Sequence, residues 1–136
     1  MPLGNAFGEA VGKVTSVRIS ELSGGQRRTE IDITGEIKGQ VPGQAFTTLV
    51  IEGVPGHAAT YTSTSTLLAA SGAVVRMSGR GVAMRTGEGH KVRCRGASCY
   101  ATDDPKLVAF NGLIGAAEIE IDPATMTAKA TAYEWK

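Results

Sequence analysis

The segment from Ala73 to Tyr100 constrains the fold of this chain more than any other. It reads A-V-V-R-M-S-G-R-G-V-A-M-R, turns at T-G-E-G-H, and returns as K-V-R-C-R-G-A-S-C-Y. Two β-prone segments joined by a short glycine-containing turn are typical of a β-hairpin, and this one is the longest in the chain. We expect most of the remaining segments to be strands that close around it.

Residues 28–39 show the clearest alternation of apolar and polar side chains. Thr29, Ile31, Ile33 and Ile37 share one face, and charged or polar residues occupy the other. This pattern predicts a strand with one buried and one solvated face. Similar segments recur between short turns such as V-P-G-Q, G-V-P-G-H and T-D-D-P. The expected strands are residues 11–20, 28–39, 45–53, 58–68, 73–85, 91–100, 106–110, 116–121 and 128–135.

These nine segments, of which 106–110 is short, amount to about eight sequential strands with short connections and predict one fold class. An all-β, up-and-down antiparallel barrel closes at eight strands and leaves room for side chains or one small ligand. We expect a flexible arm over residues 1–8, a single barrel domain over 9–136, and little or no helix beyond one turn near 67–71. A β-sandwich is the alternative, because the connections alone do not exclude Greek-key crossings.

Composition narrows the classes of partner. The chain has 136 residues and a formal net charge of +1, which is too near neutral for general nucleic-acid binding. No apolar run approaches the ~20 residues that span a bilayer, so no membrane partner is expected. The first ten residues lack the features of a secretory signal, which predicts a cytoplasmic location.

Two short motifs carry no cofactor chemistry. Residues 22–26 read L-S-G-G-Q, the signature peptide of ABC-transporter ATPases, but no phosphate loop accompanies it, so a β-turn is the interpretation. The G-R-G at 79–81 lacks the third glycine and the following helix of a dinucleotide site. The sequence therefore predicts no cofactor.

The spacing of strands and glycines resembles a known group of small barrels. The runs G-E-I-K-G at 35–39 and L-V-A-F-N-G, E-I-E-I-D and Y-E-W near the C-terminus are similar to allene oxide cyclase and dirigent-type barrels, including bacterial relatives of unknown function. The resemblance spans roughly residues 28–136 and carries no catalytic motif. It implies a lumen that binds apolar or polyketide-like molecules and assembly as a dimer or trimer.

Residues 58–68 are β-prone but polar on both faces. Threonines 60, 62, 64 and 66 share one face, and Tyr61, Ser63 and Ser65 share the other. Such hydroxyl-lined faces favour a polar cavity over a hydrated edge. Tyr61, Thr64 and Tyr100 are therefore candidate ligand-binding residues, with tyrosines able to donate hydrogen bonds to a carbonyl. Ordinary core filling is the alternative for the tyrosines.

Four arginines of the central hairpin are the candidate anion-binding residues. Arg76 and Arg80 lie on one face of the first strand, and Arg93 and Arg95 on one face of the second. Inside the lumen they would bind a carboxylate, enolate or phosphate. Facing outward, they would be solvated or would pair with acids such as Glu118 and Glu120, and the alternation with Val92 and Cys94 favours this second arrangement.

The histidines and cysteines offer weaker candidates. His57 and His90 lie in the third and fifth turns, which could share one end of a barrel, but no third ligand accompanies them, so no metal is expected. Cys94 is expected to be a buried, unreactive thiol, and Cys99, five residues along the same strand, to point to the opposite face.

These features support three functions. The first is a cyclase or isomerase acting on a small apolar molecule with a carbonyl or anionic group, with no catalytic residue assigned. The second is a non-catalytic binding protein for the same ligand class. The third is an oligomeric scaffold with a filled barrel. The sequence does not decide between them.

Overall fold

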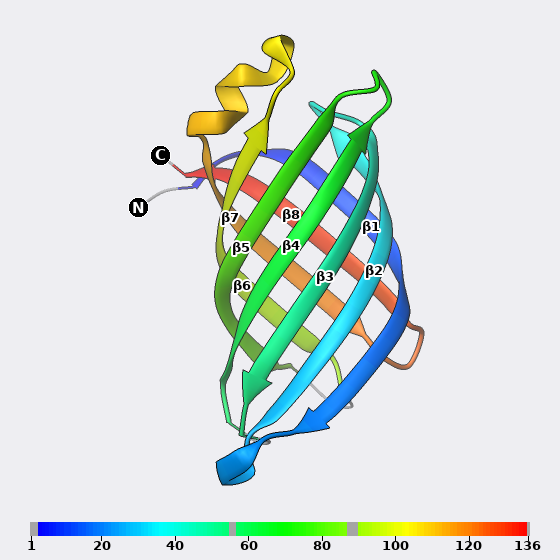
Figure 1. The fold of residues 1–136 in the computed structure, drawn as a ribbon, viewed down its shortest axis with the longest axis vertical. Coiled ribbons are helices and arrows are strands. Elements are labelled where there is room, and N and C mark those ends of the chain that lie inside the picture. Colours follow the sequence, from blue (N-terminus) through cyan, green and yellow to red (C-terminus); the bar gives the residue numbers. More distant parts are fainter. Residues whose placement is uncertain (1–2, 55–56, 87–89, 136) are drawn as a thin grey trace.

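The chain forms a closed antiparallel barrel of eight strands (Figure 1). A computed structural model describes residues 3–54, 57–86 and 90–135, with side chains described from Gly8 onward. Each strand pairs with the next along the chain, and β8 pairs back with β1. The predicted barrel is confirmed, and the sandwich is not formed. The elements are β1 (Leu3–Glu21), η1 (Ser23–Gly25), β2 (Arg27–Gly39), β3 (Gly43–Gly53), β4 (Ala59–Ala69), β5 (Val74–Arg85), β6 (Val92–Thr102), η2 (Pro105–Gly112), β7 (Ile114–Asp122) and β8 (Thr127–Trp135).

The two ends of the barrel differ in what they carry. The β1–β2, β3–β4, β5–β6 and β7–β8 connections lie at one end, which is the lower end in Figure 1. The β2–β3 and β4–β5 turns and the short helix η2 lie at the other, upper end. Up-and-down connectivity produces this division, because each strand returns the chain to the end where the previous one began.

Alternation decides which side chains fill the interior. In β2, Ile31 is buried and Ile33 and Ile37 are partly buried, whereas Asp32, Thr34 and Glu36 are exposed. The face predicted to be buried is therefore the one that lines the lumen. In the central hairpin, Arg85 lies opposite Val92 and Gly81 opposite Gly96, which fixes the register that the sequence left open.

A β-bulge in β1 is held from the outside by one carboxylate. The register shifts between Val14 and Ser16 where β1 pairs with β2. The Asp32 carboxylate accepts hydrogen bonds from Ser16 Oγ at 2.8 Å and from Thr48 Oγ1 at 2.9 Å, linking β1, β2 and β3. The bond from Ser16, followed by that from Thr48, lowers the pKa of Asp32 below its ordinary value of 3.8.

Two clusters of buried side chains fill separate levels of the barrel. The lower cluster consists of Val14, Ile31, Leu49, Tyr61, Ala83, Cys94, Ile121 and Ala128. The upper cluster consists of Leu67, Ala69, Ala73, Val75 and Tyr100, with Leu107, Phe110 and Leu113 of the η2 region packed against it. The short helix therefore covers part of the upper end.

Residues 106–110 form part of η2 rather than the predicted strand. The Asp104 side chain accepts a hydrogen bond from the Lys106 backbone N–H at 2.8 Å, and Pro105 occupies the first turn. The Asn111 side chain bonds both the N–H and the C=O of Thr102. These local hydrogen bonds override the β-propensity of the apolar residues, because capping and proline geometry both favour a helical turn.

The remaining differences concern the ends of strands. Strand β1 begins at Leu3, opposite Trp135 of β8, and so includes residues 3–8 of the segment expected to be a flexible arm. The L-S-G-G-Q segment turns through η1, a 3-10 helix of three residues, in which Gly24 and Gly25 have positive φ. The predicted turns at 53–57 and 86–90 include residues 55–56 and 87–89, which lie outside the described residues.

Candidate functional site

A layer of fully buried side chains divides the barrel interior. Leu49, Tyr61 and Cys94 each expose 2% or less of their surface, and they belong to the lower cluster that spans the lumen. We call these three residues the partition. A hollow lies on each side of it, and the two hollows have different sizes and linings.

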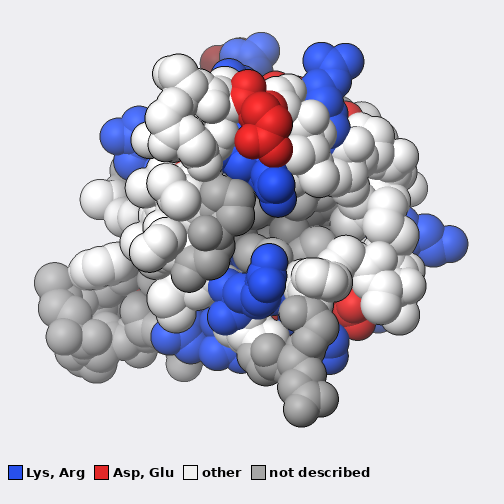
Figure 2. All heavy atoms as spheres, turned by 90° about the horizontal axis from the view of Figure 1, so that it is seen from below, with Lys and Arg blue, Asp and Glu red and all other residues white. Residues whose placement is uncertain are grey.

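The lower mouth is the larger hollow, with a volume of about 580 Å³. That volume lies within the range of about 300–1,000 Å³ typical of small-molecule sites. Its apolar wall includes Ile31, Ile51, Ala83, Val92 and Ile121. Figure 2 looks into this end of the molecule and shows it hollowed, with Lys and Arg atoms at its edge.

Four basic or imidazole side chains line the lower mouth. Arg27 and Arg85 continue the inward-facing rows of β2 and β5, and His57 and His90 lie in the adjoining connections. The expectation that both histidines share one end of the barrel is confirmed. Positive charge above an apolar wall suits an amphipathic anion, because the charged head can remain near water while the tail leaves it.

The two arginines of the mouth differ in how their charge is neutralised. Arg27 pairs with Glu21 at 3.3 Å, and both side chains are substantially exposed. Arg85 makes no ion pair with any of the described residues. Among the described residues, no carboxylate forms an ion pair with Arg85 that an anion entering the mouth would have to displace.

The upper cavity is smaller, at about 150 Å³, and largely apolar. One wall is built from small residues of β1, β7 and β8, including Gly12, Ala117, Ala130 and Ala132. The opposite wall carries the hydroxyls of β3, β4 and β6. These are Thr47, Ser63, Ser65, Ser98 and Tyr100.

The hydroxyls of the upper cavity are largely bonded in pairs. Thr47 Oγ1 and Ser65 Oγ lie 2.7 Å apart, and Ser98 Oγ and Tyr100 OH lie 2.9 Å apart. Burial raises the pKa of Tyr100, and the hydrogen bond to Ser98 opposes that shift. Tyr100 therefore remains protonated at neutral pH and can act as a hydrogen-bond donor.

Tyr61 of the partition lies across two glycines of the neighbouring strands β5 and β6. It pairs with Gly81, which pairs with Gly96, and a Cβ on Gly96 would lie 2.6 Å from the Tyr61 hydroxyl. That hydroxyl is buried and has no hydrogen-bond partner among the described residues. Burial, with a smaller contribution from Cys94, raises the pKa of Tyr61 to about 12.

Cys94 behaves as the sequence predicts. It is buried and unpaired, whereas Cys99 is unpaired and exposed, so the two thiols lie on opposite faces of β6. Burial raises the pKa of Cys94 to about 12, which keeps its sulfur protonated and poorly nucleophilic at neutral pH.

The structure separates the residues proposed from sequence into two groups. Tyr61 and Tyr100 point inward, to the partition and to the upper cavity. The other five lie on the outer face of β4, β5 and β6 and line neither hollow. They are Thr64, Arg76, Arg80, Arg93 and Arg95.

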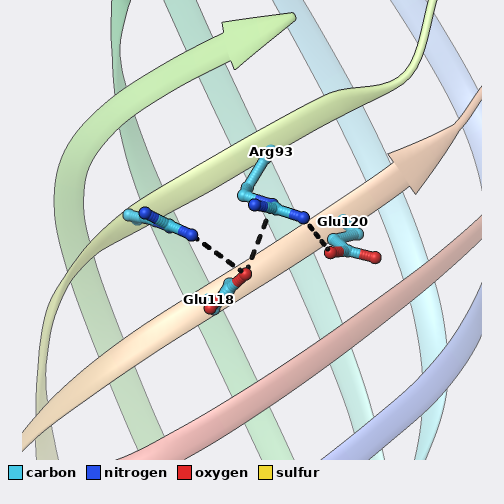
Figure 3. A network of polar contacts seen from close by, with 4 residues as sticks. Arg93, Glu118 and Glu120 are labelled. Atoms are coloured by element: carbon cyan, nitrogen blue, oxygen red, sulfur yellow. Dashed lines mark hydrogen bonds and ion pairs between the residues drawn. The ribbon is translucent and has the colours of Figure 1, made fainter. Parts of the chain in front are cut away.

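The arginines face outward because the hairpin register places glycine, alanine and cysteine on the inner face. Arg93 forms ion pairs with Glu118 at 3.3 Å and Glu120 at 3.0 Å (Figure 3), and Arg95 lies 3.8 Å from Glu118. This is the alternative arrangement given above, in which the arginines pair with acids of another strand. Half-exposed pairs of this kind contribute little to stability individually.

Sequence reasoning did not select the two arginines of the lower mouth. Arg27 lies two residues before Thr29 and so extends the inward row of β2, and Arg85 likewise extends the row that contains Ala83. That continuation of the period-two pattern was visible in the sequence. The register of the hairpin, which gives Arg85 its direction, was not.

The described residues contain neither a metal-binding cluster nor a membrane-spanning helix. No group of three or more His, Cys, Asp or Glu side chains there is arranged to hold a metal ion. In the same residues, no helix has both the length and the apolar character required to span a bilayer.

Comparisons with known proteins show the fold and no family. No family model matches the chain, and no curated protein matches its sequence. A protein of unknown function from Clostridium acetobutylicum has a TM-score of 0.84 at 14% identity over 100% of both chains. A β-barrel-like protein from Acinetobacter baumannii has a TM-score of 0.82 at 14% identity, covering 99% of this chain and 96% of that one.

A third similar structure is described as an enzyme. This protein from Penicillium herquei has a TM-score of 0.67 at 13% identity, covering 98% of this chain and 97% of that one. The neighbours agree with the expectation of a small-barrel fold, and allene oxide cyclase itself is not shown.

Proposed function

We propose that the lower mouth binds a small amphipathic anion, with its apolar part against the wall of Ile31, Ile51 and Val92 and its charged group at the rim. One observation carries the proposal. A hollow of about 580 Å³ with an apolar wall also contains Arg85, which has no ion-pair partner among the described residues. A filled scaffold barrel is disfavoured by the same hollow.

The geometry supports binding better than chemistry by the tyrosines. Tyr61 lines neither hollow, so its hydroxyl does not reach a ligand in the lower mouth. Tyr100 lies in the upper cavity, on the other side of the partition. Neither tyrosine is therefore placed to donate a hydrogen bond to a carbonyl of a ligand in the lower mouth.

Isothermal titration with decanoate tests the proposal, and decanol provides an uncharged ligand of the same chain length. We expect decanoate to bind more tightly than decanol, and Arg85→Gln to weaken decanoate about tenfold or more, since a hydrogen bond to a charged group contributes about 1.5–3 kcal/mol. Arg76→Gln, on the exposed outer face, is the matched control and should change nothing. Equal affinities for decanoate and decanol, or an unaffected Arg85→Gln variant, would contradict the proposal.

An isomerase or cyclase acting on the same ligand class is the second candidate. The observation in its favour is that His57 and His90 line the same hollow as Arg85, so that proton-moving groups lie in the site that would hold the anion. The fold shared with the Penicillium herquei enzyme is consistent with it.

This second candidate predicts exchange of protons next to a ligand carbonyl. Incubation of 4-oxodecanoate in D₂O, followed by proton NMR, should show deuterium incorporation beside the ketone faster than in buffer. The His57→Gln and His90→Gln double variant should lose that acceleration. Exchange at the buffer rate leaves binding as the function.

A further inference from the structure

We propose that the upper cavity is a second binding site, specific for a small uncharged molecule that carries one hydroxyl or carbonyl oxygen on an apolar ring. This site lies beyond the function proposed above and shares no residue with the rim of the lower mouth. Its ligand differs in charge and in size. The argument rests on the cavity, its asymmetric walls and its unused hydrogen-bonding capacity.

The volume limits the ligand to about one ring. The cavity measures about 150 Å³. A dry cavity of that size lined by apolar side chains in another protein holds benzene or xenon, so an aromatic or cyclohexyl ring is the appropriate scale. A ten-carbon chain, as proposed for the lower mouth, is too large for it.

The two walls of the cavity are unlike. On the side of β1, β7 and β8, small side chains such as Ala117, Ala130 and Ala132 leave space for the face of a ring. The other side carries hydroxyls at positions where a plain core would hold apolar residues. Buried hydroxyls cost free energy unless they are bonded, so their concentration on one wall requires a reason.

The hydroxyl pair of Thr47 and Ser65 has one donor left over. The two oxygens lie 2.7 Å apart, and one hydroxyl proton makes that bond. The second proton has no acceptor among the described residues. Because both side chains line the cavity, this donor is available to an oxygen inside it.

Gly79 opens a gap between two further hydroxyls. It pairs with Ser63 on one side and with Ser98 on the other. A Cβ at this position would lie 2.8 Å from Ser63 Oγ, so the missing side chain leaves that hydroxyl accessible. No hydrogen bond from the Ser63 side chain to a described residue is present, which gives the wall a second group able to bond an oxygen.

These features exclude an anionic ligand from this cavity. Apart from the exposed Glu9, the lining residues are apolar or carry neutral hydroxyls, and burial raises the pKa of Tyr100 and so keeps it protonated. No cationic side chain lines the cavity, among the residues the structure describes, to compensate an anion. A phenol, a cyclic alcohol or a cyclic ketone fits both walls, with its oxygen toward Ser65 and its ring toward Ala130.

Titration of ¹⁵N-labelled protein with phenol tests this proposal, with toluene and benzoate as probes that lack the hydroxyl or add a charge. We expect phenol to bind with a Kd of roughly 0.1–1 mM, the scale for a ligand of seven heavy atoms. The amide shifts should centre on Ser65, Gly79 and Ser98. Toluene should bind about tenfold more weakly, and benzoate should leave these amides unshifted.

Two variants assign the binding to this cavity. Ala132→Leu should fill the small-residue wall and abolish phenol binding, and Ala101→Leu, on the exposed face of β6, is the control. Ser65→Ala, which is conservative enough to preserve the fold, should weaken phenol about tenfold and leave toluene unchanged. Equal binding of phenol and toluene, retained phenol affinity in Ser65→Ala, or no shift at the three amides would overturn the proposal.

Discussion

The lower mouth and the upper cavity are built by the same strands and the same alternation, yet they differ in volume and in chemistry. The mouth is about 580 Å³ and has arginine and histidine near its opening, whereas the cavity is about 150 Å³ and has neutral hydroxyls within it. The arginines and histidines of the mouth are therefore exposed side chains, whereas the five hydroxyl residues of the cavity wall are buried or partly buried. The difference shows how desolvation sorts polar side chains along a barrel axis.

The partition keeps the two regions distinct. Tyr61 fills the lumen at this level because it lies across Gly81 and Gly96, where any larger residue would run into the neighbouring strand. Leu49 and Cys94 complete the layer. Opening this layer should therefore join the two hollows. A substitution confined to one hollow should leave ligand binding in the other unchanged.

Opening the partition should have the largest effect on stability. We expect Leu49→Ala to lower the free energy of unfolding by about 3 kcal/mol, because Leu49 is fully buried and its removal leaves a cavity. It should also weaken the separation of the two hollows. Urea unfolding measures the change, and Val50→Ala, on the outward face of the same strand, should cost much less.

Alkaline pH should destabilise the barrel through the partition. The pKa of Cys94 is raised from 9.0 to about 12 and that of Tyr61 from 10.0 to about 12, so both stay protonated when folded. The unfolded chain loses these protons first, and the stability that is full below pH 9 is lost progressively toward about pH 12.

Tyr61→Phe separates the two contributions to this alkaline loss. The variant should flatten the fall in unfolding free energy above pH 10, and at pH 7 it should be as stable as the parent or more so, since it removes a buried hydroxyl without a partner. A loss of stability at pH 7 would mean that the hydroxyl is bonded in solution. Thermal unfolding at pH 7, 9 and 10.5 measures both effects.

The two arginines of the mouth should contribute unequally to anion binding. Arg85→Gln should weaken decanoate about tenfold, and Arg27→Gln only about threefold, because Glu21 already neutralises part of the Arg27 charge. Neither variant should alter phenol binding in the upper cavity. Calorimetric titrations at one ionic strength compare the two variants. A larger loss of decanoate affinity in Arg27→Gln than in Arg85→Gln would contradict the claim that Glu21 neutralises part of the Arg27 charge.

The smallest effect is expected at the outer face, away from both hollows. The pKa of Asp32 is lowered, so its stabilising contribution is present above about pH 4 and lost as the pH falls through the folded value. Asp32→Asn should slightly reduce stability at pH 7 and remove that acid dependence, with both ligand affinities unchanged. The free energy of unfolding, measured between pH 2.5 and 7, tests this prediction, and Asp103→Asn provides a control at an exposed carboxylate.

The sequence predicts the barrel well because its strands obey period two. Ile31 and Ile33 identify the inner face of β2, and the short turns favour pairing of consecutive strands, which the structure shows throughout the barrel. The one element predicted with the wrong type is η2, where Phe110 has the propensity of a strand residue but Asp104 and Asn111 supply local hydrogen bonds. Such side-chain capping is a weak signal in a single sequence.

The site was harder to predict because the position of a hollow depends on which side chains face one another across the lumen. Tyr61 and Tyr100 both lie inside the barrel, but only Tyr100 lines a hollow, because Tyr61 packs with Leu49 and lies across Gly81 and Gly96. The four outward arginines of the hairpin carried the strongest sequence signal for an anion. Register, which a sequence does not reveal, directs them to the surface and Arg85 to the mouth.

Simultaneous occupancy of the two hollows is the most direct test of this account. The Kd of phenol is measured by NMR in the absence of decanoate and again with decanoate at saturation. Two sites separated by the partition predict that the Kd changes by less than about twofold, within the usual limits of additivity. Displacement of phenol by decanoate would show a single continuous lumen and contradict the division on which both proposals depend.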